Sequence, residues 1–361
     1  MSHIQKAQVA MREKNMEALI ISSELNQRYL SGFAYTDGYM LILPTTAYLI
    51  TDFRYIEAAK ATVNPAECQA VMPTPNTPML PFIYSLLQKH EVSVLTFEEA
   101  DVSVSLLERL TASFEGVSMA SGASALLTEL RLFKDEAEID AIRRAQKITD
   151  DAFAHILNFI TPDRTELEVA LEIEFFMRAR GSEGTAFETI AVSGTNSSRP
   201  HGVPRPVKLE QGFLTMDFGA RIDGYCADMT RTVVLGKADA DIKRLYNTVL
   251  EAQTSAIAGL TCGMKCSDAD KIARDIIDGA GYKGCFGHSL GHGVGLFVHE
   301  KPNFSPAAPA DMLLLPGHVV TVEPGIYMEG KYGCRIEDMI YVQPDGSIVD
   351  LTHSPKELIE I

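Results

Sequence analysis

Residues 215–232 read TMDFGARIDGYCADMTRT, and this stretch decides the fold of the C-terminal part of the chain. Apolar residues run towards and away from a short polar segment with a glycine, a pattern typical of two antiparallel strands joined by a turn. We therefore predict a hairpin that folds around residues 221–224. Asp217 and Asp228 lie on opposite arms of this hairpin, so that folding brings their side chains close together.

These two aspartates are the first indication of chemistry. Aspartate is uncommon in strands, and a buried carboxylate needs a charged partner or a metal ion. Two neighbouring carboxylates also repel each other unless a cation lies between them. A purely structural interpretation stays open, in which Asp228 pairs with Arg231 and Asp217 starts a turn.

Three of the nine histidines are crowded into residues 286–300, FGHSLGHGVGLFVHE. They are His288, His292 and His299, with several glycines between them. Glycine lets the backbone turn tightly or approach a ligand closely, and neutral imidazole is a common nitrogen ligand of metal ions. We therefore expect at least one of these histidines to bind a metal ion.

Two more carboxylates extend this pattern. Glu323 in TVEPGIY and Glu337 in CRIEDMI are each predicted to lie within an otherwise apolar strand. Structural interpretations stay open, because glutamate before proline can mark a sheet edge and Glu337 can pair with Arg335. The complete candidate set is Asp217, Asp228, His292, Glu323 and Glu337. A set with four carboxylates suits two divalent cations such as manganese, cobalt, iron or zinc better than a structural zinc, which usually takes cysteines.

Helical and strand patterns alternate through the N-terminal third of the chain, which predicts an α/β domain over residues 1–133. A long helix over residues 134–160 opens the second domain, residues 134–361. There the pattern changes to strands punctuated by glycine, with a few helices between them. The second domain is therefore predicted to be α+β.

Composition excludes several classes of function. The 361 residues include 32 Lys and Arg against 48 Asp and Glu, a net charge of −16, which is the wrong sign for binding nucleic acid or an anionic membrane. No apolar run approaches the roughly 18 residues of a spanning helix, and the N-terminus lacks the apolar core of a signal peptide. The six cysteines are scattered without a paired motif. We expect a cytoplasmic protein that binds neither nucleic acid nor membrane.

Several short stretches resemble the pita-bread metallopeptidase family, which includes methionine aminopeptidase, aminopeptidase P, prolidase and the creatinases. In chain order they are PHG at 200–202, MDFG at 216–219, GYCADMTRT at 224–232, GHGVG at 291–295, VHEKP at 298–302, EPGIY at 323–327 and RIED at 335–338. The N-terminal domain, with its stretch NQRYLSGF, resembles the aminopeptidase P and prolidase branch. The resemblance implies a creatinase-type α/β N-terminal domain followed by an α+β pita-bread catalytic domain.

The resemblance also implies roles for single residues. Asp217 would chelate one metal ion, Asp228 and Glu337 would bridge two, and His292 and Glu323 would hold the other. Manganese is the expected ion, with cobalt, zinc and iron as alternatives. Glu323 is the candidate for moving the proton of the attacking water. Further active-site roles around the metal ions are implied for His201, His288, His299 and Arg335.

The activity implied is that of an exopeptidase that hydrolyses Xaa-Pro bonds, in dipeptides or at the N-terminus of longer peptides, through a hydroxide that bridges the metal ions. The substrate is then a peptide with proline at its second position, and a homodimer is also implied. A substrate carboxylate gripped by a histidine or by Arg335 would make the enzyme a dipeptidase, whereas an open cleft would make it an aminopeptidase. The sequence leaves this choice open.

Three alternatives to this activity stay open. A binding protein could keep the fold and the metal ligands as a scaffold without hydrolysis. GHSLG at 287–291 fits the G-x-S-x-G motif of serine hydrolases, with Ser289 as nucleophile, although that motif needs a strand before it and a helix after it. A metal-free hydrolase of the creatinase kind is the third, but that branch departs at the ligand positions retained here.

Overall fold

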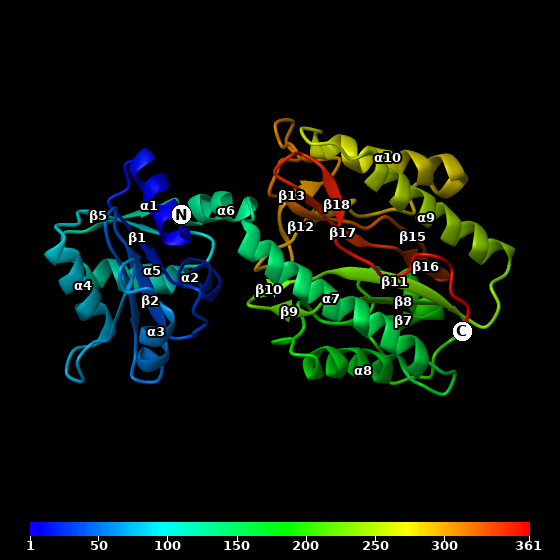
Figure 1. Cartoon of the computed structure of the whole chain (residues 1–361), viewed down its shortest axis with the longest axis horizontal. Helices are drawn as coiled ribbons and strands as arrows, with labels where there is room; N and C mark the ends of the chain where they lie inside the picture. Colours follow the sequence, from blue (N-terminus) through cyan, green and yellow to red (C-terminus); the bar gives the residue numbers. More distant parts are fainter. The chain divides into compact units, whose positions relative to one another are not determined.

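The computed structural model describes every residue from Met1 to Ile361. The chain divides into two compact units, Met1–Arg131 and Leu132–Ile361, which can be followed by colour in Figure 1. None of the helices combines the length and the apolar character that crossing a membrane requires.

The first unit is built on one six-stranded sheet with the order β4-β3-β2-β1-β5-β6. β2 lies antiparallel to β1 and β3, whereas β5 runs parallel to both β1 and β6, and β3 runs parallel to β4. The strands are β1 Ala18–Ile21, β2 Gly38–Ile42, β3 Ala47–Thr51, β4 Gln69–Val71, β5 Val94–Phe97 and β6 Ser118–Ser121. The helices are α1 His3–Glu13, α2 Glu24–Ser31, α3 Ile56–Thr62, α4 Met79–Lys89, α5 Val104–Ser113 and α6 Ala123–Leu132.

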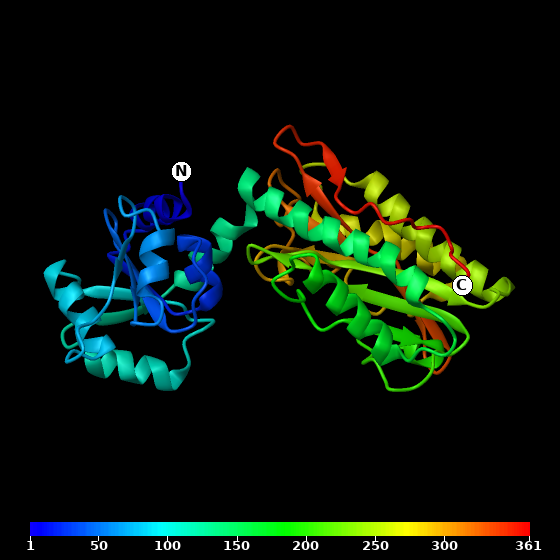
Figure 2. The same cartoon turned by 60° about the horizontal axis from the view of Figure 1, so that its bottom comes forward.

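Both faces of this sheet are covered, as β1 illustrates. Ala18 and Ile20 pack in one apolar cluster with residues of α4 and α5, and the alternating Leu19 and Ile21 are equally buried on the opposite face. A strand buried on both faces is a continuous apolar run, here ALII. Figure 2 shows the helices of this unit around its strands. The predicted α/β class is confirmed.

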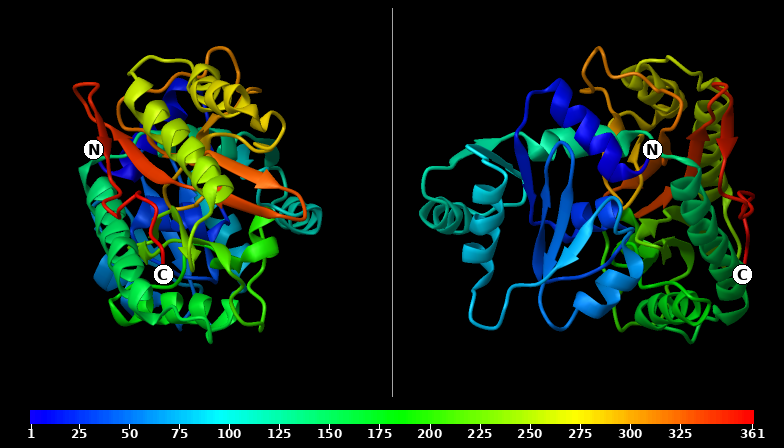
Figure 3. Two further views of the ribbon diagram at one scale, coloured as in Figure 1. Left: turned by 90° about the vertical axis from the view of Figure 1, so that its right-hand side faces the viewer. Right: turned by 60° about the vertical axis from the view of Figure 1, so that its left-hand side comes forward.

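The second unit packs two pairs of helices on opposite sides of its strands (Figures 1 and 3). α7 Glu136–Phe159 and α8 Glu166–Ala179 form one pair, which packs on β7, β8 and β11. α9 Ala240–Gly259 and α10 Cys266–Ile277 form the other, which packs mainly on the strands from β13 to β17. The active-site residues predicted from the sequence come from the strands and loops between these two layers of helices.

The strands of the second unit form two larger sheets and two small hairpins, which confirms the predicted α+β class. The three-stranded sheet has the order β11-β8-β7 and the five-stranded sheet the order β13-β12-β14-β17-β18. The bounds are β7 Ile190–Ser193, β8 Gly212–Phe218, β9 Arg221–Ile222, β10 Tyr225–Cys226, β11 Met229–Leu235, β12 Gly291–Gly293, β13 Glu300–Phe304, β14 Val319–Val322, β15 Gly325–Met328, β16 Tyr332–Arg335, β17 Asp338–Val342 and β18 Ile348–Asp350, with short helical segments at Gly194–Ser198 and Asp278–Tyr282.

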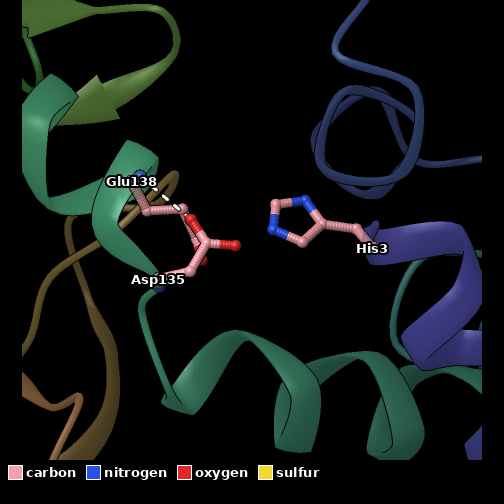
Figure 4. Close-up of side chains that lie close together, drawn as sticks. All are labelled: His3, Asp135 and Glu138. Carbon is pink, nitrogen blue, oxygen red and sulfur yellow. Dashed lines mark hydrogen bonds between the residues drawn. The ribbon is translucent and has the colours of Figure 1, made fainter. Parts of the chain in front are cut away.

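The start of α7 is fixed by a capping box, drawn in Figure 4. Asp135 accepts a hydrogen bond from the backbone N–H of Glu138 at 3.2 Å, and the Glu138 carboxylate accepts one from the backbone N–H of Asp135 at 2.8 Å. Thr165 and Glu168 form the same reciprocal pair at the start of α8. Each box satisfies two N–H groups that would otherwise lack a partner at the start of a helix.

The predicted hairpin around residues 221–224 is confirmed. β8 pairs antiparallel with β11, which places Asp217 opposite Thr230, and β9 and β10 form the tip. Asp223 and Gly224 adopt φ values of +51° and +86° at the turn. Positive φ at both central residues is what the favoured two-residue hairpin turn requires.

The expectation that Glu323 and Glu337 lie within strands is wrong. β14, Val319–Val322, ends just before Glu323, and β17, Asp338–Val342, begins just after Glu337. Between them the chain leaves the five-stranded sheet, forms the separate hairpin β15–β16 and returns. Pro324 has no N–H to donate to a neighbouring strand, so the ladder cannot continue through it. Both glutamates therefore lie where the chain crosses between two sheets.

Candidate metal centre

All of the site residues predicted from the sequence line one cavity of about 610 Å³ in the second unit. Asp217 lies in β8, His292 in β12 and Arg335 at the end of β16, whereas the other six lie in loops next to β7, β11, β12, β13, β14 and β17. The residues are His201, Asp217, Asp228, His288, His292, His299, Glu323, Arg335 and Glu337.

A nitrogen and two carboxylates meet at the centre of this cavity. Donor atoms of Asp228, His292 and Glu337 all lie within 4.8 Å of one another. His292 Nε2 lies 3.6 Å from Asp228 Oδ2 and 3.4 Å from Glu323 Oε1. The other ring nitrogen, Nδ1, lies 3.1 Å from the Gly293 carbonyl oxygen, to which it donates. This contact leaves the Nε2 lone pair facing the carboxylates, as in metal-binding histidines.

The carboxylates are held at a cost in electrostatic free energy. Burial raises the pKa of Asp228 well above its ordinary value, and the charges of Asp217 and Glu323 raise it further. The pKa of Glu337 is raised in the same way, by burial and then by Asp228. Burial raises the pKa of Glu323 to about 8, although Arg335 acts in the opposite direction. Desolvated like charges of this kind favour either a bound proton or a bound cation.

One oxygen of Asp217 has no partner in the protein. Its Oδ2 accepts a hydrogen bond from Arg335 Nη2 at 2.5 Å, whereas its Oδ1 is buried without any hydrogen bond. An unsatisfied buried acceptor destabilises the fold unless it gains a ligand. The unpaired oxygen and the oxygen-rich donor set therefore fit divalent cations at this position.

The structural interpretation of Asp228 is not supported. Arg231 does not pair with it but with Asp338, whose Oδ1 lies 2.7 Å from Arg231 Nη2. Both side chains of that ion pair are almost completely buried. Asp228 is thus left without the arginine that could have neutralised it.

The structural interpretation of Glu337 fails for a similar reason. Arg335 directs its Nη2 to Asp217, and Glu337 instead accepts a hydrogen bond from the Thr230 hydroxyl at 2.6 Å. The same hydroxyl accepts a bond from Arg335 Nε at 2.9 Å. Thr230 therefore holds the orientation of both side chains.

A second threonine plays the same part for His292 and Glu323. The Thr321 hydroxyl accepts a bond from the backbone N–H of His292 at 3.1 Å and donates one to Glu323 Oε1 at 3.3 Å. Neither Thr230 nor Thr321 is among the residues predicted from the sequence. Each lies two residues from a predicted ligand along the chain, and this period-2 spacing, which places side chains on the same face of a strand, could have identified them.

The histidines around the centre differ in how they are engaged. His288 Nδ1 lies 2.8 Å from the Ser289 carbonyl oxygen and its Nε2 lies 3.0 Å from the Tyr327 hydroxyl, so both nitrogens have protein partners. Burial lowers the pKa of His288 to about 4. Burial and then the charge of His201 lower the pKa of His299. The ring nitrogens of His299 and His201 are not engaged by protein groups, so they can reach a substrate.

The surroundings of Ser289 differ from a serine-hydrolase elbow. No strand leads into this residue, and it is followed by strand β12, Gly291–Gly293, rather than by a helix. The adjacent imidazole of His288 contacts the carbonyl oxygen of Ser289 and not its hydroxyl. The strand-turn-helix arrangement that exposes a nucleophilic serine is therefore not formed.

Gly291 is expected to be indispensable for the position of His292. A Cβ atom at Gly291 would lie 2.0 Å from the backbone oxygen of Thr321, so alanine must push β12 away from β14. We expect Gly291→Ala to destabilise the protein by about 1 to 3 kcal/mol, seen as a lower melting temperature. Gly287→Ala is the matched control, because nothing lies within 4 Å of its Cβ position. Equal melting temperatures for the two variants would contradict this account.

The two units match two family models. Residues 3–133 match the Creatinase/Prolidase N-terminal domain, and residues 140–344, more than half of the chain, match Metallopeptidase family M24. The chain belongs to metallopeptidase family M24. The expected creatinase-type N-terminal domain and pita-bread catalytic domain are thereby confirmed.

Other M24 peptidases resemble this one over nearly the whole chain. The structure of an Xaa-Pro dipeptidase from Bacillus anthracis has a TM-score of 0.93 at 38% identity and covers 99% of both chains. An X-Pro aminopeptidase from Thermotoga maritima MSB8 has a TM-score of 0.90 at 35% identity, over 98% of this chain and 100% of the other. An Xaa-Pro dipeptidase of Pyrococcus horikoshii is 34% identical over 351 residues, 97% of this chain and 96% of that protein.

Proposed function

We propose that this M24 peptidase is a metal-dependent exopeptidase that hydrolyses Xaa-Pro bonds in dipeptides or at the N-terminus of longer peptides. The observation that carries the proposal is the meeting of His292 Nε2 with the carboxylates of Asp228, Glu323 and Glu337, in one cavity with the unpaired Oδ1 of Asp217. The names of the relatives, Xaa-Pro dipeptidase and X-Pro aminopeptidase, support the substrate class.

Five side chains would hold two divalent cations. Asp217 would chelate one, His292 and Glu323 the other, and Asp228 and Glu337 would bridge them. Manganese is the expected ion, with cobalt, zinc and iron as alternatives. Bound divalent cations act as Lewis acids that polarise a peptide carbonyl and make water a better nucleophile near neutral pH.

The side chains in and around the cluster are assigned the remaining catalytic roles. Glu323 is assigned to accept and return the proton of the attacking water, because its buried carboxylate retains a proton easily. His299 and His201 are assigned to hydrogen-bond the substrate carbonyl, since their ring nitrogens have no protein partners. His288 is assigned to support this wall of the cavity through Tyr327.

Arg335 is assigned to position Asp217 rather than to grip a substrate carboxylate. Its side chain donates to Asp217, to the Thr230 hydroxyl, to the Tyr327 hydroxyl and to the Pro200 carbonyl oxygen. With most of its N–H groups committed to the protein, it has little left to offer a peptide terminus.

The experiment that tests the proposal uses chelator-treated protein to which Mn²⁺, Co²⁺ or Zn²⁺ is returned. We expect restored cleavage of Ala-Pro or Ala-Pro-Ala and no cleavage of Ala-Ala-Ala, which lacks proline. The ratio of kcat/KM for the tripeptide and the dipeptide distinguishes an aminopeptidase from a dipeptidase. Stoichiometric metal binding without cleavage of either proline peptide would instead support a scaffold.

The variant Ser289→Ala is expected to keep at least about a third of the wild-type kcat/KM for the better proline peptide. Removing a true serine nucleophile costs about 10⁶-fold in kcat, so the two mechanisms predict very different rates. The measurement is steady-state hydrolysis with saturating metal. A loss of more than 100-fold in the variant would revive the serine-hydrolase interpretation.

The homodimer that the resemblance implies and the cytoplasmic location expected from the sequence stay predictions. Size-exclusion chromatography with light scattering would check the first, and fractionation of cells that express the full chain would check the second.

A further inference from the structure

One loop of the cavity wall carries His201, and the position of its backbone determines where this side chain lies. It leaves β7 at Ser193, includes the short helix Gly194–Ser198 and returns at Arg205. The part that lines the cavity is Pro200, His201, Gly202, Val203 and Pro204. Because the ring of His201 is exposed and has no hydrogen bond to the protein, only the loop can determine where this ring lies.

The two ends of the loop are tied together by one buried carboxylate. Glu166, the first residue of α8, has a fully buried side chain and does not line the cavity. Its Oε1 accepts bonds from the Ser193 N–H at 2.8 Å, the Ser193 hydroxyl at 3.0 Å and Arg205 Nη2 at 2.8 Å. Its Oε2 accepts bonds from the Arg205 N–H at 3.0 Å, Arg205 Nε at 2.9 Å and Asn196 Nδ2 at 3.1 Å.

The backbone at the start of α8 reinforces this connection. The N–H of Glu166 donates to the Val207 carbonyl oxygen and the N–H of Leu167 donates to the Arg205 carbonyl oxygen, each at 3.1 Å. These N–H groups belong to the first turn, where a helix leaves its own donors unpaired. The returning arm of the loop is therefore fixed to a helix whose start is itself capped.

The tip of the loop, around Ser197 and Pro200, is held by hydrogen bonds from β16. Arg335 Nη1 donates to the Pro200 carbonyl oxygen at 3.2 Å, and the N–H of Gly333 donates to the Ser197 hydroxyl at 3.0 Å. Arg335 also donates to Asp217, so one side chain fixes the tip of the loop relative to the carboxylate cluster. With Glu166 at the base and Arg335 at the tip, the loop has little freedom to displace His201.

The carboxylate of Glu166 is suited to this task because it is ionised. Burial by itself raises the pKa of Glu166, but the hydrogen bonds from Arg205 and Ser193 lower it more, and the net pKa lies below its ordinary value. Hydrogen bonds to a charged acceptor are shorter and stronger than those between neutral groups, and the planar guanidinium of Arg205 makes two of them in parallel.

We propose that Glu166, through its ion pair with Arg205, is a positioning residue that sets the place of His201 in the substrate cavity. This inference rests on the proposed function for its kinetic test but not for its spectroscopic one. Glu166 touches neither the metal ligands nor the cavity, so any effect on catalysis must pass through the loop.

The kinetic test is a double-mutant cycle with the metal-loaded full chain, assayed well below its melting temperature. Glu166→Gln is expected to lower kcat/KM for the better proline peptide about 10- to 100-fold, since small displacements of a positioned group carry penalties of this size. In a His201→Ala background the same change should cost less than about 3-fold, because coupled residues are non-additive. An equal loss in both backgrounds would mean general damage and would overturn the proposal.

A conservative variant and a control sharpen the cycle. Arg205→Lys keeps the charge but loses the parallel pair of donors, so we expect a smaller loss that again disappears in the His201→Ala background. It also serves as the test variant if Glu166→Gln does not fold. Glu174→Gln, on the same helix, is expected to behave as wild type in both backgrounds.

The spectroscopic test needs no activity. The Cε1–Hε1 signal of His201 can be identified in the NMR spectrum by its absence in His201→Ala. Glu166→Gln is expected to shift this signal and Glu174→Gln to leave it in place. An unshifted signal in Glu166→Gln would overturn the proposal. Failure of the wild type to cleave any Xaa-Pro peptide would overturn the proposed function and leave this test decisive for the loop.

Discussion

Replacing Glu337 with Gln is expected to lower kcat/KM for Xaa-Pro peptides by more than about 100-fold, the upper range for losing a residue that merely supports a metal ligand. The same change should make the metal-free protein more thermostable at pH 8. Both effects follow from the burial of Glu337 beside Asp228, where a carboxylate is costly without a cation and useful with one. The measurements are steady-state kinetics with metal, and thermal unfolding with chelator.

The matched control is Glu329→Gln, which removes an exposed carboxylate from the neighbouring β15–β16 hairpin. It should change neither activity nor metal-free stability appreciably, because surface substitutions are usually within about 0.5 kcal/mol. Retention of more than a tenth of the activity by Glu337→Gln, together with full metal content, would show that this residue is not a ligand.

The stability of the metal-free protein is expected to fall as the pH rises from about 5.5 to 8.5. The pKa of Glu323 in the folded protein is raised to about 8, and those of Asp228 and Glu337 are raised as well. A carboxyl group with a raised pKa stabilises the fold below its unfolded pKa, and this stability is lost as the pH rises through the folded value. The measurement is the melting temperature at closely spaced pH values in chelator.

Saturating Mn²⁺ should reverse the trend, because metal binding requires ionised ligands and becomes stronger as protons leave. Glu323→Gln provides the control, since it should flatten the metal-free slope by removing its own titration and its effect on the pKa of Asp228 and Glu337. A melting temperature of the metal-free wild type that stays constant or rises between pH 6 and pH 8 would refute this picture of the cluster.

Local sequence signals predicted much of this architecture. The hairpin at residues 221–224 depends on a two-residue turn and on strands adjacent in the chain, and its register follows from alternation. Strands such as β1 and β3 are short apolar runs with clear ends, so a local pattern is enough to indicate them. Features of this kind need no information from distant parts of the chain.

Features that depend on distant partners could not be predicted. The sequence suggested neighbours for Arg231 and Arg335, but each pairs with a carboxylate more than 100 residues away. The strand breaks at Glu323 and Glu337 follow from the chain moving between sheets, which no local pattern reveals. The hydrogen bonds by which Glu166 joins the two ends of the loop could not be predicted. A glutamate in the first turn of a helix is ordinarily a surface residue that complements the helix dipole.

The crossings at Glu323 and Glu337 affect how cooperatively the second unit unfolds. Asp217 belongs to the sheet covered by α7 and α8. The two glutamates lie where the chain leaves and re-enters the sheet covered by α9 and α10. Ions shared by the two sheets would add to the buried Arg231–Asp338 ion pair that already joins them, so they would raise the free energy needed to open the catalytic unit between the sheets. Metal loading would thus make this local opening rarer, and with it proteolytic cleavage of the partly opened chain.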